Sequence, residues 1–401
     1  MQANQQSRPK IAAVVTVYRK YSHAQHIVDR LLDGYGWEGR YHHPPLDLVS
    51  LYVDQVGADD LSRERASRFP GMKIYRTIAS TLTQGGSKLA VDGVVLVGEH
   101  GHYPRNEKGQ TEYPRYPFFQ QIVEVFRAGN RSAPLFSDKH LSWNWEWAKE
   151  MYETSRTLRF PFMAGSSLPV TWRIPSIEMP LGATVREAVC ICYGGVDSYD
   201  FHGLETIQCM VERRRGGEVG VRWLQAYRGE SFWAAMKEGV WSHDLMQAAL
   251  CRSHTLTPAR TGFNDIMPSS DQMRELVKDP VAYTYEHADG LRCTMLLMNG
   301  LVRDFNFAAR IDGSPRILST QMYLPMPDGR TTLASFFSPL VFHMENMFLT
   351  GQTPYPIERT LLTTGLTASG VESLYRSQTR VDTPHLAIRY QAREQSTFER
   401  T

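Results

Sequence analysis

Short runs of apolar, β-branched residues alternate with helical segments along about the first 165 residues of the chain. The first run is KIAAVVTV at Lys10–Val17 and the second is DLVSLYV at Asp47–Val53, with a helical spacing of apolar residues between them. A strand that is apolar at every position is typical of a parallel sheet, because helices cover both faces of such a sheet. The alternation therefore predicts an α/β domain over residues 1–165, built on a Rossmann-type, doubly wound parallel sheet.

The pattern changes after residue 165, where longer strand-like runs follow one another with hairpin-type connections. These runs are Val185–Tyr193, Gly220–Tyr227, Tyr283–Asn299 and Arg303–Ile311. They predict an α+β domain over residues 166–401 with a large open, mostly antiparallel sheet, and with helices at Phe201–Arg214 and Val371–Gln378. We expect this domain to bind substrate, and the exposed face of its open sheet predicts a homo-oligomer, a dimer or a tetramer.

Charge and composition exclude several classes of protein. Lys and Arg number 44 against 42 Asp and Glu, a net charge of +2, which argues against a partner such as nucleic acid or a membrane surface. No stretch approaches the roughly 18 apolar residues that span a bilayer. The polar segment Met1–Lys10 and the five scattered cysteines favour a cytoplasmic protein, with export after removal of a leader as the alternative.

The turn after the first strand is where a Rossmann fold carries its phosphate-binding glycines. Here Thr16–Tyr21 (TVYRKY) occupies that turn, and every glycine of the G-x-G-x-x-G pattern is replaced. Arg19 and Lys20 can hold an anion by charge. Alternatively, the two tyrosines of this segment fill the space that a diphosphate would take. Asp54 ends the second strand, where an acidic residue binds ribose hydroxyls.

Three further segments carry a resemblance that spans most of the chain. GEHGH at Gly98–His102 follows the strand Asp92–Val97, FSDKHL lies at Phe136–Leu141, and DFHGLE lies at Asp200–Glu205. In this order they resemble the TPN-x-x-H loop, the EKP motif and the G-x-H-x-x-D motif of the Gfo/Idh/MocA oxidoreductase family, which includes glucose–fructose oxidoreductase and inositol dehydrogenase. The segment Glu358–Arg380 resembles the helix that returns to the first domain in that family.

The resemblance implies an oxidoreductase that uses NAD or NADP on a hydroxyl of a sugar, polyol or glycoside. Lys139 matches the lysine of the EKP motif and His202 the histidine of the later motif, so both are expected to handle the proton. Glu205 lies three residues after His202 on the same helical face and can orient its imidazole. The candidate cofactor-binding residues are Thr16, Tyr18, Arg19, Asp54 and Glu99.

Histidines at the predicted strand ends support a different chemistry. His100, His102, His140 and His202 lie close in the sequence to carboxylates, as does His23 after the first strand. Imidazoles mixed with carboxylates bind divalent metals such as zinc or manganese. The alternative is therefore a metal-dependent hydrolase, lyase or isomerase without nicotinamide. A second alternative is a non-catalytic ligand-binding relative.

Overall fold

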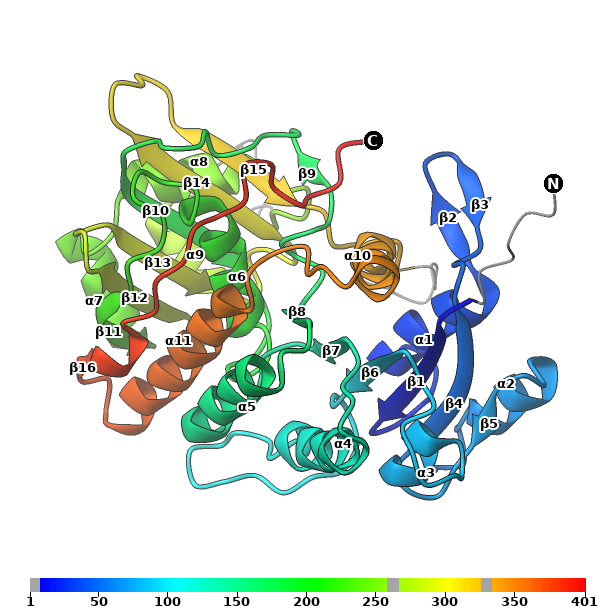
Figure 1. Ribbon diagram of the computed structural model, residues 1–401. Helices are drawn as coiled ribbons and strands as arrows, with labels where there is room; N and C mark the ends of the chain where they lie inside the picture. Colours follow the sequence, from blue (N-terminus) through cyan, green and yellow to red (C-terminus); the bar gives the residue numbers. More distant parts are fainter. Residues whose placement is uncertain (1–7, 258–266, 326–333) are drawn as a thin grey trace. The chain divides into compact units, whose positions relative to one another are not determined.

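The computed structural model describes residues 8–257, 267–325 and 334–401 (Figure 1). The chain forms two compact units. The described part of the first unit is residues 8–104, 112–165 and 334–357. The second unit takes residues 105–111, the described residues between 166 and 325, and residues 358–401. No helix of the described residues is long and apolar enough to cross a membrane.

The first unit is built on a six-stranded parallel sheet with the strand order β5-β4-β1-β6-β7-β8. The strands are β1 (Lys10–Val15), β4 (Asp47–Val53), β5 (Lys73–Ile74), β6 (Gly93–Val97), β7 (Leu135–Asp138) and β8 (Phe162–Gly165). Five of the six residues of β1 are fully buried, as its uninterrupted apolar sequence predicts. Strand order reverses between β1 and β6, which confirms the predicted Rossmann-type, doubly wound sheet.

The described residues of the first unit also form six helices and a hairpin. They are α1 (His23–Asp33), α2 (Ser62–Arg68), α3 (Ile78–Thr83), α4 (Arg115–Gly129), α5 (Trp145–Leu158), α10 (Phe337–Thr350), and the strands β2 (Tyr35–Trp37) and β3 (Arg40–His42). Helix α10 belongs to this unit although it is far along the sequence. Trp37 stacks on Phe342 with 4.5 Å between ring centroids, and Arg30 donates to the Ala334 carbonyl at 2.8 Å.

The C-terminal part of the chain is divided between the two units. Residues 334–357, which include α10, belong to the first unit. The segment Glu358–Arg380, which the resemblance implied to be the returning helix, is grouped with the second unit and includes most of α11 (Ile357–Tyr375). Helix α10 is apolar on nearly every face, so its sequence lacks the one-sided pattern that would identify its partner.

The second unit contains an eight-stranded sheet with the order β16-β11-β12-β13-β10-β14-β15-β9. Its strands are β9 (Arg173–Ile174), β10 (Val185–Cys192), β11 (Val221–Arg228), β12 (Val281–His287), β13 (Arg292–Leu297), β14 (Phe305–Ile311), β15 (Leu318–Met322) and β16 (Val381–Asp382). Every neighbouring pair is antiparallel except β10 with β13. The large, mostly antiparallel sheet is therefore confirmed.

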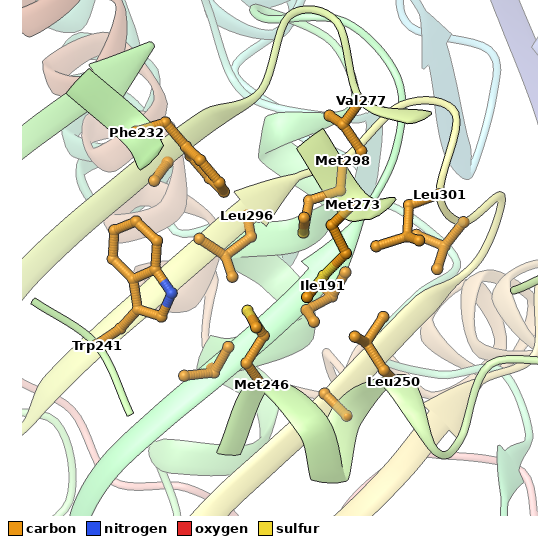
Figure 2. Close-up of a cluster of buried hydrophobic side chains, with 14 of the residues drawn as sticks. Ile191, Phe232, Trp241, Met246, Leu250, Met273, Val277, Leu296, Met298 and Leu301 are labelled. Atoms are coloured by element: carbon orange, nitrogen blue, oxygen red, sulfur yellow. The ribbon is translucent and has the colours of Figure 1, made fainter. Parts of the chain in front are cut away.

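Helices cover both faces of this sheet. The helices of the unit are α6 (Asp200–Val211), α7 (Glu230–Glu238), α8 (His243–Leu250), α9 (Ser270–Leu276), α11 and the short 3-10 helix η1 (Pro384–Leu386). On one face, α6 approaches so closely that a Cβ on Gly203 would lie 2.6 Å from Met295 and 2.8 Å from Cys192. On the other face, Ile191 and Leu296 pack with side chains of α7, α8 and α9 (Figure 2).

The covered second face corrects one prediction. The sequence predicted an exposed sheet face as the basis of a homo-oligomer, but Phe232, Met246 and Met273 of the three helices fill that face with a buried apolar cluster. Helices α7, α8 and α9 were not predicted, and their apolar sides are what the sheet residues bury against. The sheet therefore gives no reason of its own to expect a dimer or tetramer.

Candidate functional site

A cavity of about 530 Å³ lies in the first unit, beside the loops that follow β1, β4 and β6. Its lining includes Tyr18 and Arg19 after β1, Gln55 and Asp60 after β4, and Gly101 and His102 after β6. These loops leave the carboxyl ends of the strands next to the point where strand order reverses. Ligands of open α/β sheets bind at this position, and the volume lies within the usual range for small-molecule sites.

The turn after β1 is held by side chains of its own unit. The Tyr18 side chain is only 1% exposed, and its hydroxyl donates to Asp29 at 2.5 Å; burial, together with Asp29, raises the pKa of Tyr18. Asp29 also pairs with Arg65 at 2.8 Å. Thr16 is fully buried, and its hydroxyl donates to the Glu99 carbonyl at 2.6 Å. The Arg19 side chain is exposed at the cavity.

The rim formed by the β4 and β6 loops is tied together by hydrogen bonds. Gln55 donates to the His102 carbonyl at 3.1 Å and accepts from the His102 amide at 2.9 Å. Asp54 accepts from the Tyr52 and Tyr103 hydroxyls, each at 2.8 Å, so its carboxylate has a fixed direction at the end of β4. Gly101 has φ +104°, and a Cβ there would lie 2.7 Å from the Tyr103 ring. The backbone therefore comes close to its neighbours at this corner.

Glu99 is the centre of a buried charge cluster at the same edge of the sheet. Its carboxylate accepts from Arg115, the first residue of α4, and lies 3.4 Å from the ammonium of Lys139. Burial alone would raise the pKa of Glu99, but the charges of Lys139 and Arg115 outweigh it and hold that pKa well below its usual value. The guanidinium of Arg115 also contacts His140 Nε2 at 3.1 Å. A side chain on Gly98 would collide with Arg115, with a Cβ 2.5 Å from Cγ.

The backbone at Lys139 is in a conformation that non-glycine residues rarely adopt. Its φ is +66°, in the left-handed region, which costs about 1 kcal/mol for a side chain such as lysine. Its amide donates to the Gly165 carbonyl at 3.0 Å, so the end of β8 holds this conformation in place. Since Lys139 is 3% exposed, this geometry turns an ammonium toward Glu99 inside the unit. Strained residues of this kind concentrate at functional sites.

Three more residues meet beside this cluster. His23, the first residue of α1, contacts Asp138 Oδ2 through Nδ1 at 2.7 Å. Its ring lies edge-to-face with that of His100, with 5.3 Å between centroids. His100 also has a positive φ, +69°. Its buried Nε2 has no hydrogen-bond partner among the described residues.

The second unit holds the other two predicted catalytic residues. His202 lies in the first turn of α6, is 6% exposed, and has an edge-to-face contact with Tyr199 at 5.5 Å between centroids. The carboxylate of Glu205 accepts from the Ser166 amide at 3.0 Å and from the Ser166 hydroxyl. Asp200 accepts the amides of Ser198 and Phe201 at 2.9 and 2.8 Å, which fixes the start of the helix; burial raises its pKa to about 6.

The predicted metal site finds no support. Among the described residues there is no group of three or more His, Cys, Asp or Glu side chains arranged to hold a metal ion. His140 Nε2 faces the guanidinium of Arg115, and a second cation there would be repelled. His102 is exposed on its loop. Arg115, by contrast, is a site residue that the sequence did not single out, because no local pattern reveals which carboxylate a distant arginine will meet.

Comparisons with known proteins give a match in structure only. No protein-family model matches the chain, and no curated protein matches its sequence. The chain is similar to myo-inositol dehydrogenase from Lactobacillus casei, solved with NAD(H) and myo-inositol, at 11% identity and a TM-score of 0.55 over 94% of this chain and 96% of that one. It is also similar to scyllo-inositol dehydrogenase from the same organism, at 13% identity and a TM-score of 0.52 over 94% and 98%. GenD2 of gentamicin A biosynthesis, solved with NAD, matches at 12% identity and a TM-score of 0.53 over 95% and 97%. These matches confirm the predicted fold, which this chain shares with the three dehydrogenases.

Proposed function

We propose that the protein is an oxidoreductase that transfers a hydride between a hydroxyl of a polyol or sugar and NAD or NADP. The observation that carries this proposal is the buried Lys139–Glu99 pair, at the carboxyl ends of the strands where the cavity of about 530 Å³ also opens. The inositol dehydrogenase of the same fold was solved with NAD(H) and myo-inositol, which supports both the cofactor and the substrate class. We propose a carbohydrate-like small molecule as the substrate.

The residues present fit a dinucleotide, with the anion bound differently from a glycine-rich turn. Ser22 caps α1 by accepting from the Gln25 amide at 3.2 Å, so the protein itself satisfies this helix end. The exposed guanidinium of Arg19 at the cavity is then the group that would hold the diphosphate. Asp54 would hold ribose hydroxyls. The side chains of Thr16 and Tyr18 support the turn from inside the unit.

Lys139 supplies the proton chemistry of the proposed reaction. A bound NAD or NADP supplies the hydride acceptor or donor. Oxidation of a hydroxyl also releases a proton, and the amine of Lys139 takes it or, in the reverse direction, returns it. The ammonium then steadies negative charge on the substrate oxygen. Glu99 holds the ammonium in position, and Arg115 balances the remaining charge of that carboxylate.

His202 remains a proposed second proton-handling residue, on the second unit. His202 lies in the first turn of the fully buried helix α6, and Asp200 fixes that turn. This placement supports the proposal that the imidazole is held in one orientation. We propose that Glu205 acts by holding Ser166 and this end of the unit together. We also retain a cytoplasmic location and a homo-oligomer as proposals, and light scattering after gel filtration tests the latter.

Titration of the protein with NADH and NADPH, followed by nicotinamide fluorescence and calorimetry, tests the proposed function. We expect one site per chain, and Arg19→Ala should raise Kd about tenfold through the lost charged contact. Lys20→Ala is the matched control, because it removes the same charge from the same turn, whereas the structure places the Lys20 ammonium over the Tyr21 ring, 5.0 Å from its centroid, and Arg19 in the cavity lining. A screen of inositols and sugars with the preferred cofactor follows. If neither nucleotide binds at millimolar concentration, the proposal is wrong.

A further inference from the structure

We propose that His100 and His23, with Asp138, form a proton route between Lys139 and solvent. The inference rests on the proposed function, because only a reaction that releases or consumes a proton at Lys139 needs such a route. It gives His100 and His23 a role in proton transfer, whereas the metal alternative treated these histidines as metal ligands. All the residues of the route lie in the first unit.

The need for a route follows from the burial of Lys139. Its side chain is only 4% exposed and its ammonium is held 3.4 Å from Glu99. This burial limits direct contact between the ammonium and bulk water. In the oxidative direction Lys139 must first give up a proton before it can accept one from a hydroxyl, so a neighbouring base has to receive that proton.

His100, which lies just after the end of β6, is the base that we assign to this step. It directly follows Glu99, and its Nε2 is buried without a hydrogen-bond partner among the described residues. Burial, with added repulsion from His23 and Lys139, lowers the pKa of His100 to about 4. The imidazole is therefore neutral at pH 7 and offers a lone pair. The protein maintains a left-handed φ of +69° at this residue, although glycine or asparagine would fit that conformation more easily.

His23 and Asp138 extend the route toward solvent. The edge-to-face contact at 5.3 Å brings the His23 ring next to that of His100. Asp138, which is 1% exposed, contacts His23 Nδ1 at 2.7 Å and so fixes the ring orientation, as carboxylates do for catalytic imidazoles. The His23 side chain is 18% exposed, unlike the two buried groups behind it. It is therefore where the route opens.

The proton transfers balance without any further reactant. In the oxidative direction, Lys139 releases a proton to His100, His100 passes a proton to His23, and His23 releases one to water. Lys139, now neutral, accepts the proton of the substrate hydroxyl and returns to its charged form. In the reductive direction every transfer is reversed. The number of protons on the three residues is the same before and after each turnover.

Other charged groups around these rings set the electrostatics of the route. Glu99 and Asp138 favour a passing positive charge on His100, whereas Lys139 and His23 oppose it. His26 also lies beside the route, where its ring stacks on Phe337 at 4.9 Å between centroids. This balance keeps the resting His100 ring neutral, while Glu99 and Asp138 stabilise the proton in transit.

Two variants of the full-length protein test the route. His100→Gly keeps the positive φ accessible and leaves space for a small base, and His23→Gln removes the outer imidazole. We expect kcat for hydroxyl oxidation at pH 7 to fall roughly a hundredfold in each variant, with KM little changed. Imidazole added to the buffer should restore much of the rate of His100→Gly, and a solvent deuterium isotope effect should appear in both.

His26→Gln is the matched control. It removes an imidazole from the same helix and from the same aromatic neighbour, Phe337, that His23 contacts at 5.1 Å. The kcat of His26→Gln should not increase when imidazole is added. If His100→Gly and His23→Gln keep the wild-type kcat, or if imidazole rescues neither variant, the proposed route is wrong.

A measurement without turnover separates this proposal from the proposed function. Nitrogen NMR of the histidine rings should show His100 still neutral at pH 6, with a shift of its signal in Asp138→Asn. A protonated His100 at pH 6, or no response to Asp138→Asn, overturns the route even in an active dehydrogenase. If neither cofactor binds and no polyol turns over, the function is overturned instead, and the NMR result still decides the coupling of these groups.

Discussion

Two buried charge clusters, one in each unit, serve different purposes. In the second unit, Glu218 accepts from His287 at 2.9 Å and from Arg214 at 3.2 Å, and Arg214 also pairs with Asp289 at 2.7 Å. In the first unit, Glu99 pairs with Arg115 and Lys139. Each cluster has a carboxylate between two basic groups. They differ in the backbone that carries them.

Near Glu218 the residues with positive φ are glycines, such as Gly217 and Gly220, and Glu218 also accepts the amides of Val219 and Gly220 at 2.9 and 2.8 Å. The Glu99 cluster, in contrast, is flanked by two non-glycine residues with positive φ, His100 and Lys139. A buried imidazole nitrogen without a partner among the described residues lies at both clusters, Nε2 of His287 in the second unit and Nε2 of His100 in the first. The backbone therefore separates the two clusters, since positive φ at non-glycine residues concentrates at functional sites.

Replacement of Lys139 should give the largest effect. Lys139→Met removes the charge but keeps a long side chain, and we expect kcat to fall by about 10²- to 10⁴-fold. Because Arg115 still pairs with Glu99, the free energy of unfolding should change much less than in a variant that leaves a buried charge unpaired. Steady-state kinetics and urea denaturation measure the two quantities. A large loss of stability with normal kcat would make this cluster structural as well.

Replacement of Glu218 should affect stability instead of activity. Glu218→Gln leaves Arg214 and His287 buried with less compensating charge, and we expect the free energy of unfolding to fall by about 3–5 kcal/mol. Urea denaturation at pH 7 measures this loss. At temperatures where the variant remains folded, its Kd for NADH should match the wild type. If Glu218→Gln is as stable as the wild type, the Glu218 cluster does not stabilise its unit and the proposed difference between the two clusters is wrong.

The strands could be predicted from the sequence more readily than the pairing of charged side chains. Val14 and Val95 lie in runs that are apolar at every position, and such runs fit only a sheet covered on both faces. The pairing of Glu99 with Arg115 and Lys139 depends instead on how α4 and β7 pack, which no local spacing encodes. The motif match identified Lys139 but carried no information about its left-handed backbone.

The helices that cover the second sheet, and helix α10 of the first unit, were the least predictable elements. Trp233 of α7 and Met246 of α8 pack against the second sheet, but helices of only nine and eight residues give a weak periodic signal. Tyr18 shows a related limit in the first unit. The sequence left open whether its ring fills the phosphate site, and only the contact with Asp29 reveals that its hydroxyl turns toward α1.

The smallest effect concerns acid stability and the histidines of the first unit. Burial, with added repulsion from His23 and Arg30, lowers the pKa of His26 to about 3, compared with 6.5 in the unfolded chain. Between these values the unfolded state binds more protons, so the free energy of unfolding must decrease as the pH falls from 6.5 toward 3. His26 alone should cost about 2 kcal/mol at pH 5. Urea denaturation at pH 7 and pH 5 should therefore give a smaller loss for His26→Gln than for the wild type. Equal losses in the two proteins would mean that His26 protonates as freely in the folded unit as in the unfolded chain, and that the edge of this sheet is less enclosed than the contacts of His26 with Phe337 imply.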